Sequence, residues 1–366
     1  MTKQRNIFFI HVGKTGGTTL RETVIRYGCR LYGSEVAKEN CLQFLKQHGG
    51  ESVLGEHTTG IFHYQQRYPN TKDQINKMDW LFTVRDPIAR FVSSFEYINP
   101  HNCILDAMKE QNMEQKCNRQ FQAQNFPGSF PSKFFYDCFS NVQDFLQFQP
   151  PPSVKKKKKK KKKRKQKKKK GKETVDTSLQ HVVNAEVDEQ KKKCYQLWKG
   201  AFVAGTFEDY GHMTANYQYY TNGLKLLKSQ PPGGDDGTTS HKVYVIRMEH
   251  MWEDVSTIDS LVGGSGNFSH VQGTVANQQT IVTRNATLNA DKTKSEQFKL
   301  VPLSFCCALL PDMLAFRNIV NRADNLNGEQ KHETNALVWT RCNVTSWEGL
   351  QSKCGMPKKN KKKRLK

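Results

Sequence analysis

The stretch NIFFIHVGKTGGTT, residues 6–19, constrains the fold more than any other part of this 366-residue chain. Its first half is a short continuous run of apolar, β-branched and aromatic residues, which predicts a buried parallel strand. The glycine-rich loop that follows leads into TTLRETVIRYG, residues 18–28, where apolar residues recur at helical spacing and Gly28 is a suitable helix end. The sequence therefore opens with a strand, a loop and a helix.

The same order of strand and helix recurs later in the chain. DWLFTV, residues 79–84, repeats the buried-strand pattern, and RDPIARFVSSFEY then opens a helix with Asp86 as its N-cap and Pro87 at its first position. KVYVIRME, residues 242–249, predicts a third strand, and residues 303–326 predict two apolar helical segments separated at residue 311, a proline. Strands that alternate with helices predict an α/β domain with a central parallel sheet flanked by helices.

The formal net charge of +23 is confined to two low-complexity runs. Residues 155–172 carry +16 and residues 358–366 carry +7, so the rest of the chain is neutral. A nucleic-acid-binding domain would carry its basic groove on the folded core, so no specific nucleic-acid site is expected. The runs are expected to be disordered and solvated, with a docking arm for an acidic polymer or a nuclear-targeting signal as the alternatives.

Composition divides the chain into four parts. Residues 1–150 carry the glycine loop and the second strand with its helix. Residues 151–190 are expected to form a disordered lysine-rich insertion, and residues 191–350 to complete the same sheet within a single domain. Residues 351–366 form a basic tail.

The ten cysteines do not form a metal-site pattern. No CxxC pair and no Cys/His cluster has the spacing of zinc ligands, so no metal is expected. Cys103 with Cys117 and Cys342 with Cys354 are spaced like short disulfide loops, whereas residues 306–307 lie in an apolar run typical of core thiols. The redox compartment stays open, with an oxidising one favoured.

Signals for the secretory route are weak. Sequons for N-glycosylation occur at Asn267, Asn285 and Asn343, as many as chance would supply. No stretch of 18 apolar residues and no signal peptide is present, because the run IFFI is too short for either. No membrane span is therefore expected in this chain.

The loop after the first strand has the composition of an anion-binding cradle. Backbone N–H groups between a strand and a helix lie at the positive end of the helix dipole. The glycines permit close backbone approach, the lysine supplies a positive charge, and the threonines can donate hydroxyl hydrogen bonds to phosphate oxygens. The residues concerned are Gly13, Lys14, Thr15, Gly16, Gly17, Thr18 and Thr19.

This loop matches only the end of the NTPase P-loop, G-x-x-x-x-G-K-[ST]. GKT at residues 13–15 fits its last residues, whereas Phe8 stands where the first glycine is required. Without that glycine the backbone cannot wrap β- and γ-phosphates in the same way. Hydrolysis of ATP or GTP is therefore disfavoured, and a nucleotide kinase is kept as the alternative enzyme.

A second polar group follows the second predicted strand. Arg85 closes that strand, and Arg90, Ser93, Ser94 and Tyr97 recur at helical spacing opposite the apolar stripe of the next helix. This face predicts a second anion site. The alternative is that the arginines pair with nearby carboxylates and the serines are merely solvated.

Together, the two motifs resemble those of the sulfotransferases that use 3′-phosphoadenosine 5′-phosphosulfate (PAPS), and specifically the carbohydrate branch, which includes heparan sulfate 2-O-sulfotransferase and algal and protist relatives. The resemblance covers residues 6–97, and GTFEDY (205–210) and VIRMEHMWEDV (245–255) look like later segments of such relatives. It implies a fold similar to that of P-loop NTPases. Lys14 to Thr19 would bind the 5′-phosphosulfate of PAPS, and Arg85 with Ser93 its 3′-phosphate. No metal is implied.

The resemblance also implies a reaction, in-line sulfuryl transfer to a hydroxyl of a glycan, with Lys14 stabilising the leaving phosphate. A histidine is the expected base. In the 2-O-sulfotransferase group that histidine lies shortly before the Arg-Asp-Pro motif, where LGEHTTGIFHY, residues 54–64, offers His57, with His63 as a second candidate. The family's His-Gly-His is replaced here by Gly-Glu-His.

The resemblance further suggests the Golgi lumen as the place of action, with the cytoplasm as the alternative because the chain as given shows no leader or anchor. A third functional alternative belongs to another class: a polyanion-binding protein with a degenerate enzyme core, in which the lysine-rich runs do the binding.

Overall fold

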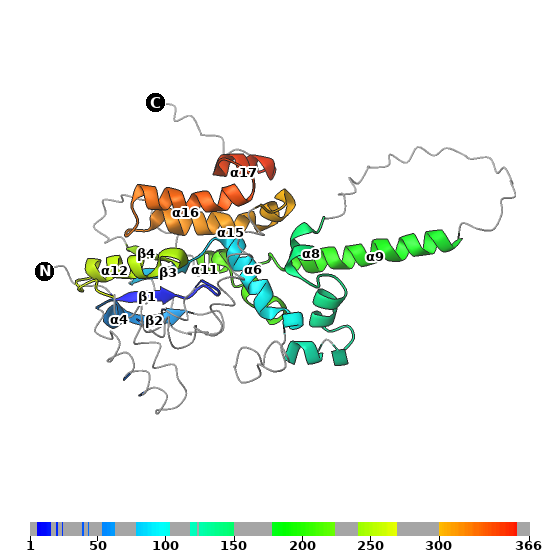
Figure 1. Cartoon of the computed structure of the whole chain (residues 1–366), viewed down its shortest axis with the longest axis horizontal. Coiled ribbons are helices and arrows are strands. Elements are labelled where there is room, and N and C mark those ends of the chain that lie inside the picture. Colours follow the sequence, from blue (N-terminus) through cyan, green and yellow to red (C-terminus); the bar gives the residue numbers. More distant parts are fainter. Residues whose placement is uncertain are drawn as a thin grey trace.

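The core of the protein is a parallel sheet of four strands in the order β2-β1-β3-β4. The computed structural model describes residues 6–15, 20, 24, 39, 43, 53–62, 78–102, 118–122, 124–149, 178–223, 241–268 and 300–356. The strands are β1 (Ile7–Ile10), β2 (Thr58–Phe62), β3 (Asp79–Val84) and β4 (Val243–Arg247). Because all the pairs are parallel, the carboxyl ends of the strands share one edge of the sheet, the edge nearest α6 (Pro87–Ile98) in Figure 1.

Three of these strands lie where the sequence predicts them, and β4 from the second half of the chain pairs with β3 from the first. All residues of β1, β3 and β4 are buried, as expected for strands covered on both faces. β2 was not predicted. Its sequence, TTGIF, has no continuous apolar run and contains a glycine, and it pairs only with β1 at the edge of the sheet.

Helices cover the sheet and extend away from it. The longer ones are α6, α9 (Ser178–Gly200), α12 (Met251–Leu261), α15 (Leu303–Arg322) and α16 (Gly328–Arg341). The shorter elements are α4 (Val53–His57), η1 (Pro100–Asn102), η3 (Ser132–Tyr136), α8 (Val142–Gln147), α10 (Phe207–Tyr210), η4 (Gly211–Met213), α11 (Tyr217–Gly223), η5 (Met248–His250) and α17 (Trp347–Lys353).

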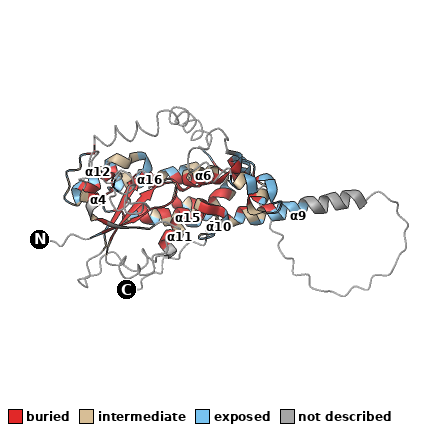
Figure 2. Ribbon diagram, turned by 90° about the horizontal axis from the view of Figure 1, so that it is seen from below, coloured by how far each residue is buried: buried red, intermediate tan, exposed pale blue. Residues whose placement is uncertain are grey.

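Alternate residues of β1, β3 and β4 enter two separate apolar clusters, because successive side chains point to opposite faces of a sheet. Phe8 and Ile10 of β1 join the larger cluster, together with residues of α6, α11 and α15. Ile7 and Phe9 join the smaller one, together with residues of α12. Figure 2 shows the buried residues concentrated in the strands and in the helices that face them.

α15 runs unbroken through Pro311, where the sequence predicted two segments. A proline removes one hydrogen bond from a helix interior. Here Leu309, Leu310 and Met313, which flank the proline, are all buried, so packing holds the helix together. α15 is also long and apolar enough to cross a membrane, but it is half buried in the protein and packs against α16 and α6, as a core helix does.

Disulfides join parts of the chain that the sequence did not pair. α15 is bonded to the ends of both helices that follow it, and a third bond joins the segment before α8 to α9. The pairs are Cys306–Cys342, Cys307–Cys354 and Cys138–Cys194.

The expected pairing of Cys342 with Cys354 is therefore wrong, and residues 306–307 are not core thiols. The reason is that α16 folds back along α15, where the N–H of Val301 donates to the carbonyl of Arg341 at 2.9 Å, so each late cysteine meets the start of α15. Cys103 and Cys117 lie outside the described residues.

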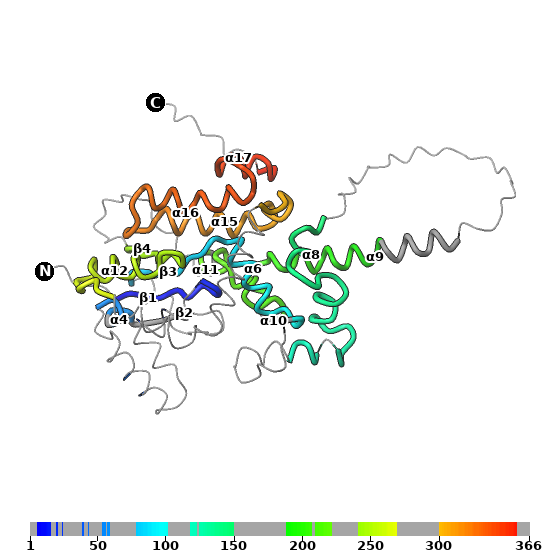
Figure 3. The backbone as a smooth tube through the Cα atoms, in the orientation of Figure 1, coloured from blue at the N-terminus to red at the C-terminus, as the bar shows by residue number. Residues whose placement is uncertain are grey.

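α9 begins at Ser178, inside the stretch 151–190 that was expected to be a disordered insertion, so the helical second half starts earlier than predicted. The helix projects from the body of the protein (Figure 1), and its inner end lies beside α8 (Figure 3). Its last turns are held by the disulfide to Cys138 and by Trp198, whose Nε1–H donates to the carbonyl of Phe145 at 3.1 Å. The lysine-rich residues 155–172 lie outside the described residues. α17 likewise crosses the boundary expected at residue 350.

Candidate anion-binding site at the carboxyl edge of the sheet

The loop that leaves β1 is tied to the neighbouring strand by Thr15. Its buried hydroxyl donates to the carbonyl of Val12 at 2.6 Å and lies 2.6 Å from the hydroxyl of Thr83 on β3. This side chain therefore fixes the loop instead of facing a ligand, contrary to the role the sequence suggested for it. The other predicted loop residues, Gly16 to Thr19, lie outside the described residues.

Gly13 packs directly against a histidine from the second half of the chain. A Cβ atom at this position would overlap the ring of His212, which belongs to η4. Only glycine allows the loop to approach so closely. The His212 ring also lies 5.5 Å from the ring of Tyr97, so three distant segments meet at this point.

Lys14 adopts a left-handed backbone conformation, with a φ of 66°. This conformation is uncommon for a residue other than glycine and concentrates at functional sites. The side chain reaches across to α6, where its Nζ lies 3.1 Å from the centroid of the Tyr97 ring. The loop lysine is thus held beside the helix that carries the second motif.

Arg85 follows β3 at the same edge of the sheet. Its main chain is held by the buried Tyr217 of α11, whose hydroxyl accepts from the Arg85 N–H at 2.8 Å and donates to the Arg85 carbonyl at 2.6 Å. Burial raises the pKa of Tyr217 well above its ordinary value, so this hydroxyl stays protonated and keeps both bonds. Among the described residues, the Arg85 guanidinium has no hydrogen-bond or ion-pair partner.

Asp86 and Pro87 start α6 as the sequence predicts. The Asp86 carboxylate accepts from the N–H of Ile88 at 2.8 Å, and Pro87 occupies the first helical position. The second carboxylate oxygen pairs with Arg341 of α16. The Asp86 carboxylate therefore forms its ion pair with Arg341, and its interaction with Arg85 is electrostatic only.

The polar face of α6 is not the uniform anion site that the sequence suggested. Arg90 is fully buried and pairs with Asp312 of α15 at 3.1 Å, and its guanidinium also donates to the carbonyl of His212 at 2.9 Å. Ser94 is buried as well and donates to the carbonyl of Arg90 at 2.9 Å. Both residues hold the fold together, so they are removed from the candidate site.

Ser93 and Tyr97 remain on the part of α6 that is not fully buried. Within the described part of the chain, the Ser93 hydroxyl forms no hydrogen bond. Burial raises the pKa of Tyr97, against the opposing effect of Arg119, so its ring is a neutral phenol at ordinary pH. Arg119 is fixed nearby through a hydrogen bond to the carbonyl of Asp209 at 3.2 Å.

These positions define the candidate anion site: the loop residues Gly13 and Lys14 after β1, and Arg85, Ser93 and Tyr97 after β3. Since β1 and β3 are direct neighbours in the sheet, two motifs about 70 residues apart in sequence lie at one edge. Residues 1–149 match the family model described as the sulfotransferase family. The matched segment contains all five residues of the site and supports sulfuryl transfer as its chemistry. No significant match was found among curated proteins or among solved structures.

The segment that matches the family model also contains His57, which the structure does not bring to this site. His57 is the last residue of α4 and immediately precedes β2. Because β2 runs parallel to β1, with Ile7 beside Thr58 and Ile10 beside Phe62, His57 lies at the amino edge of the sheet. Lys14 and Arg85 lie at the carboxyl edge. His57 is therefore badly placed to act on the same bound molecule. His63 follows Phe62 in sequence and lies outside the described residues.

β4 ends beside Arg85 and brings two more charged groups to the edge. Arg247 is buried and forms a bidentate pair with Asp254 of α12, at 2.7 and 2.9 Å, so it is structural. Glu249 follows in η5. Desolvation raises the pKa of its carboxyl group, although the residue keeps an exposed surface, and the positive charge of Arg85 opposes that shift, so the two side chains interact electrostatically.

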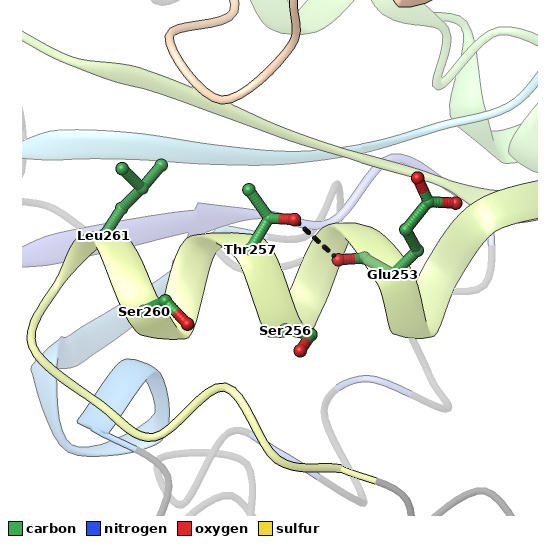
Figure 4. Close-up of a pocket in the computed structure, with 5 residues that line it drawn as sticks. All are labelled: Glu253, Ser256, Thr257, Ser260 and Leu261. Atoms are coloured by element: carbon green, nitrogen blue, oxygen red, sulfur yellow. Dashed lines mark hydrogen bonds between the residues drawn. The ribbon is translucent and has the colours of Figure 1, made fainter.

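A shallow groove of about 520 Å³ runs along α12 (Figure 4). Within it, the hydroxyl of Thr257 donates to the carbonyl of Glu253 at 2.9 Å. No residue of the candidate anion site lines the groove, so we assign it no part in anion binding. Its lining residues are Glu253, Ser256, Thr257, Ser260 and Leu261.

Among the described residues, no group of three or more His, Cys, Asp or Glu side chains could hold a metal ion. The contributions of Tyr217 and His212 were missed at the sequence level. Both lie more than 100 residues from the motifs that they support, and neither belongs to a recognisable pattern.

Proposed function

We propose that this protein is a PAPS-dependent sulfotransferase that transfers a sulfuryl group to a hydroxyl, with the P-loop-NTPase-like fold that the sequence resemblance implies. One observation carries the proposal. Lys14 and Arg85 follow neighbouring parallel strands at the same edge, and among the described residues neither the Arg85 guanidinium nor the Ser93 hydroxyl forms a hydrogen bond or an ion pair. A ligand with an anionic group at each end of a nucleoside fits two adjacent cationic positions better than a ligand with one terminal triphosphate.

In the proposed reaction, a hydroxyl oxygen of the acceptor attacks the sulfur of PAPS in line with the bond to the 5′-phosphate oxygen. The new S–O bond forms as that bond breaks, and adenosine 3′,5′-bisphosphate leaves with the electron pair. Lys14 stabilises the negative charge that builds on the departing phosphate, while Arg85 and Ser93 hold the 3′-phosphate.

The acceptor proton passes to a base on the enzyme, for which a histidine is suited by its pKa. Of the two histidines that the sequence offered, His57 is separated from Lys14 by the length of the sheet. We therefore propose His63, the residue after the carboxyl end of β2, as the base.

The acceptor is proposed to be a glycan, on the strength of the resemblance to the carbohydrate branch. We also propose that the protein acts in the lumen of the Golgi. The three disulfides support an oxidising compartment, because such bonds persist in the secretory route and are rare in the cytosol.

Isothermal titration calorimetry of the full chain with adenosine 3′,5′-bisphosphate and, separately, with ATP and magnesium tests the proposal. Binding of the bisphosphate without magnesium supports it. Binding of ATP only with magnesium would instead identify a nucleotide kinase. If neither nucleotide binds, while deletion of residues 155–172 and 358–366 abolishes salt-sensitive binding to an acidic polymer, the protein is a polyanion binder. Labelled PAPS offered with a panel of glycans and small alcohols then identifies the acceptor.

A further inference from the structure

The contact between Lys14 and Tyr97 joins the two motifs of the proposed site. Lys14 comes from the loop after β1, whereas Tyr97 lies in the last turn of α6, and the ammonium nitrogen is 3.1 Å from the ring centroid. This is well within the range at which a cation is attracted to the negative face of an aromatic ring.

Tyr97 also stands on the same face of α6 as Ser93. The two residues are four positions apart, so their side chains lie one turn apart on one side of the helix. Ser93 is proposed to hold the 3′-phosphate. A ring that holds the Lys14 ammonium on this side of α6 therefore sets where the ammonium lies relative to the Ser93 hydroxyl.

The chemistry of Tyr97 suits this role. Burial raises the pKa of its hydroxyl, so the ring is uncharged and attracts the ammonium through its π face, without forming an ion pair that would compete with a phosphate. An ammonium on a ring face still has N–H donors that point away from the ring. One side of Lys14 can therefore rest on Tyr97 while another side donates to a phosphate oxygen.

A free lysine side chain has four rotatable bonds, and fixing it when a ligand binds costs conformational entropy. Packing of the Lys14 ammonium against Tyr97 restricts that freedom before the ligand arrives. Preorganisation of this kind raises the affinity for the ligand, because the lysine side chain loses less conformational entropy when the ligand binds.

We propose that Tyr97 is a positioning residue, which holds the Lys14 ammonium on the face of α6 that carries Ser93, ready for the 5′-phosphate of the donor. The inference rests on the proposed function. It assigns to Tyr97 a role that acts through Lys14, and not through contact with the reacting atoms.

The test compares Tyr97→Leu, which removes the ring, with Tyr97→Phe, which keeps it, by calorimetry with adenosine 3′,5′-bisphosphate. We expect Tyr97→Phe to bind within about twofold of the parent and Tyr97→Leu to bind about fivefold to thirtyfold more weakly, the range of a partly to well desolvated cation–π contact. Thermal unfolding checks that both variants are folded. Tyr97→Met, also without a ring, replaces Tyr97→Leu if the latter does not fold.

The same pair of variants in a Lys14→Ala background separates positioning from a general effect on the fold. With the ammonium gone, Tyr97→Leu should cause no further loss of affinity. An equal loss in both backgrounds, or unchanged or tighter binding by Tyr97→Leu with Lys14 present, would overturn the inference. If the parent protein does not bind the bisphosphate at all, the proposed function fails and the role of Tyr97 fails with it.

Discussion

The hydroxyl of Tyr217 offers the sharpest test of how the second half of the chain supports the site. Tyr217→Phe removes one oxygen from a fully buried side chain and leaves its ring packed against Phe316 at 5.3 Å. It also removes the partner of both main-chain groups of Arg85, which lie 2.8 and 2.6 Å from that oxygen.

The size of the effect follows from these two bonds. A buried donor or acceptor that loses its partner costs about 1–3 kcal/mol. Arg85 is only partly buried, so water can reach one of its two main-chain groups after the substitution. We therefore expect a loss of about 2–3 kcal/mol in the free energy of unfolding. This is close to the cost of one main-chain group left without a partner plus one hydrogen bond to Tyr217 replaced by a hydrogen bond to water.

Urea unfolding measures that free energy. An unchanged slope of the free energy of unfolding against urea concentration would show that the substitution does not affect the denatured state. Calorimetry should show weaker binding of adenosine 3′,5′-bisphosphate, because Arg85 is no longer fixed. Tyr210→Phe is the matched control: it loses one hydrogen bond, to the carbonyl of Leu197 at 3.0 Å, and should leave that affinity unchanged. If Tyr217→Phe lowers the free energy of unfolding by less than about 0.5 kcal/mol and still binds adenosine 3′,5′-bisphosphate with the parental affinity, the idea that Tyr217 holds Arg85 is refuted.

Three further predictions concern the chemistry. Lys14→Ala should lower kcat by about a hundredfold to a thousandfold with the melting temperature unchanged, as for loss of one oxyanion donor; a parental rate would remove the lysine from the mechanism. His57→Ala should keep activity and His63→Ala should lose it, with bisphosphate affinity intact in both; the reverse pattern would return His57 to the site. Desolvation raises the pKa of the partly exposed Glu249 carboxyl, so the folded protein binds this proton at a higher pH than the unfolded chain does. As the pH falls and this carboxyl is protonated, the negative charge that competes with phosphate for Arg85 disappears. Glu249→Gln should therefore tighten bisphosphate binding at neutral pH and differ least from the parent at low pH, which calorimetry across pH 5–8 measures; parallel profiles would contradict this.

The sequence predicted the parts of the fold that depend on local pattern. The apolar runs of β1, β3 and β4 and the cap formed by Asp86 are all local signals, and they lie where expected. Because β1 and β3 are parallel neighbours in the structure, the lysine loop and Arg85 lie at the same edge of the sheet.

What the sequence did not predict depends on distant partners. Arg90 lies opposite the apolar stripe of α6, a position normally exposed, yet it is buried because its partner Asp312 is 222 residues away on a helix that covers that face. The disulfides of α15 likewise depend on the direction in which α16 folds back. His57 was misplaced for a different reason: β2 has no apolar run, so nothing in the sequence showed on which edge of the sheet its start would lie.

The pairing of β3 with β4 has a consequence for the lysine-rich stretch that interrupts the chain. The parts before and after this stretch are joined by strand pairing, by the Arg90–Asp312 ion pair and by the Cys138–Cys194 bond, none of which uses the residues in between. The cost of closing a long connection grows only with the logarithm of its length, at about 0.6 kcal/mol per doubling. A change in the length of the lysine tract at this point should therefore have little effect on the stability of the fold.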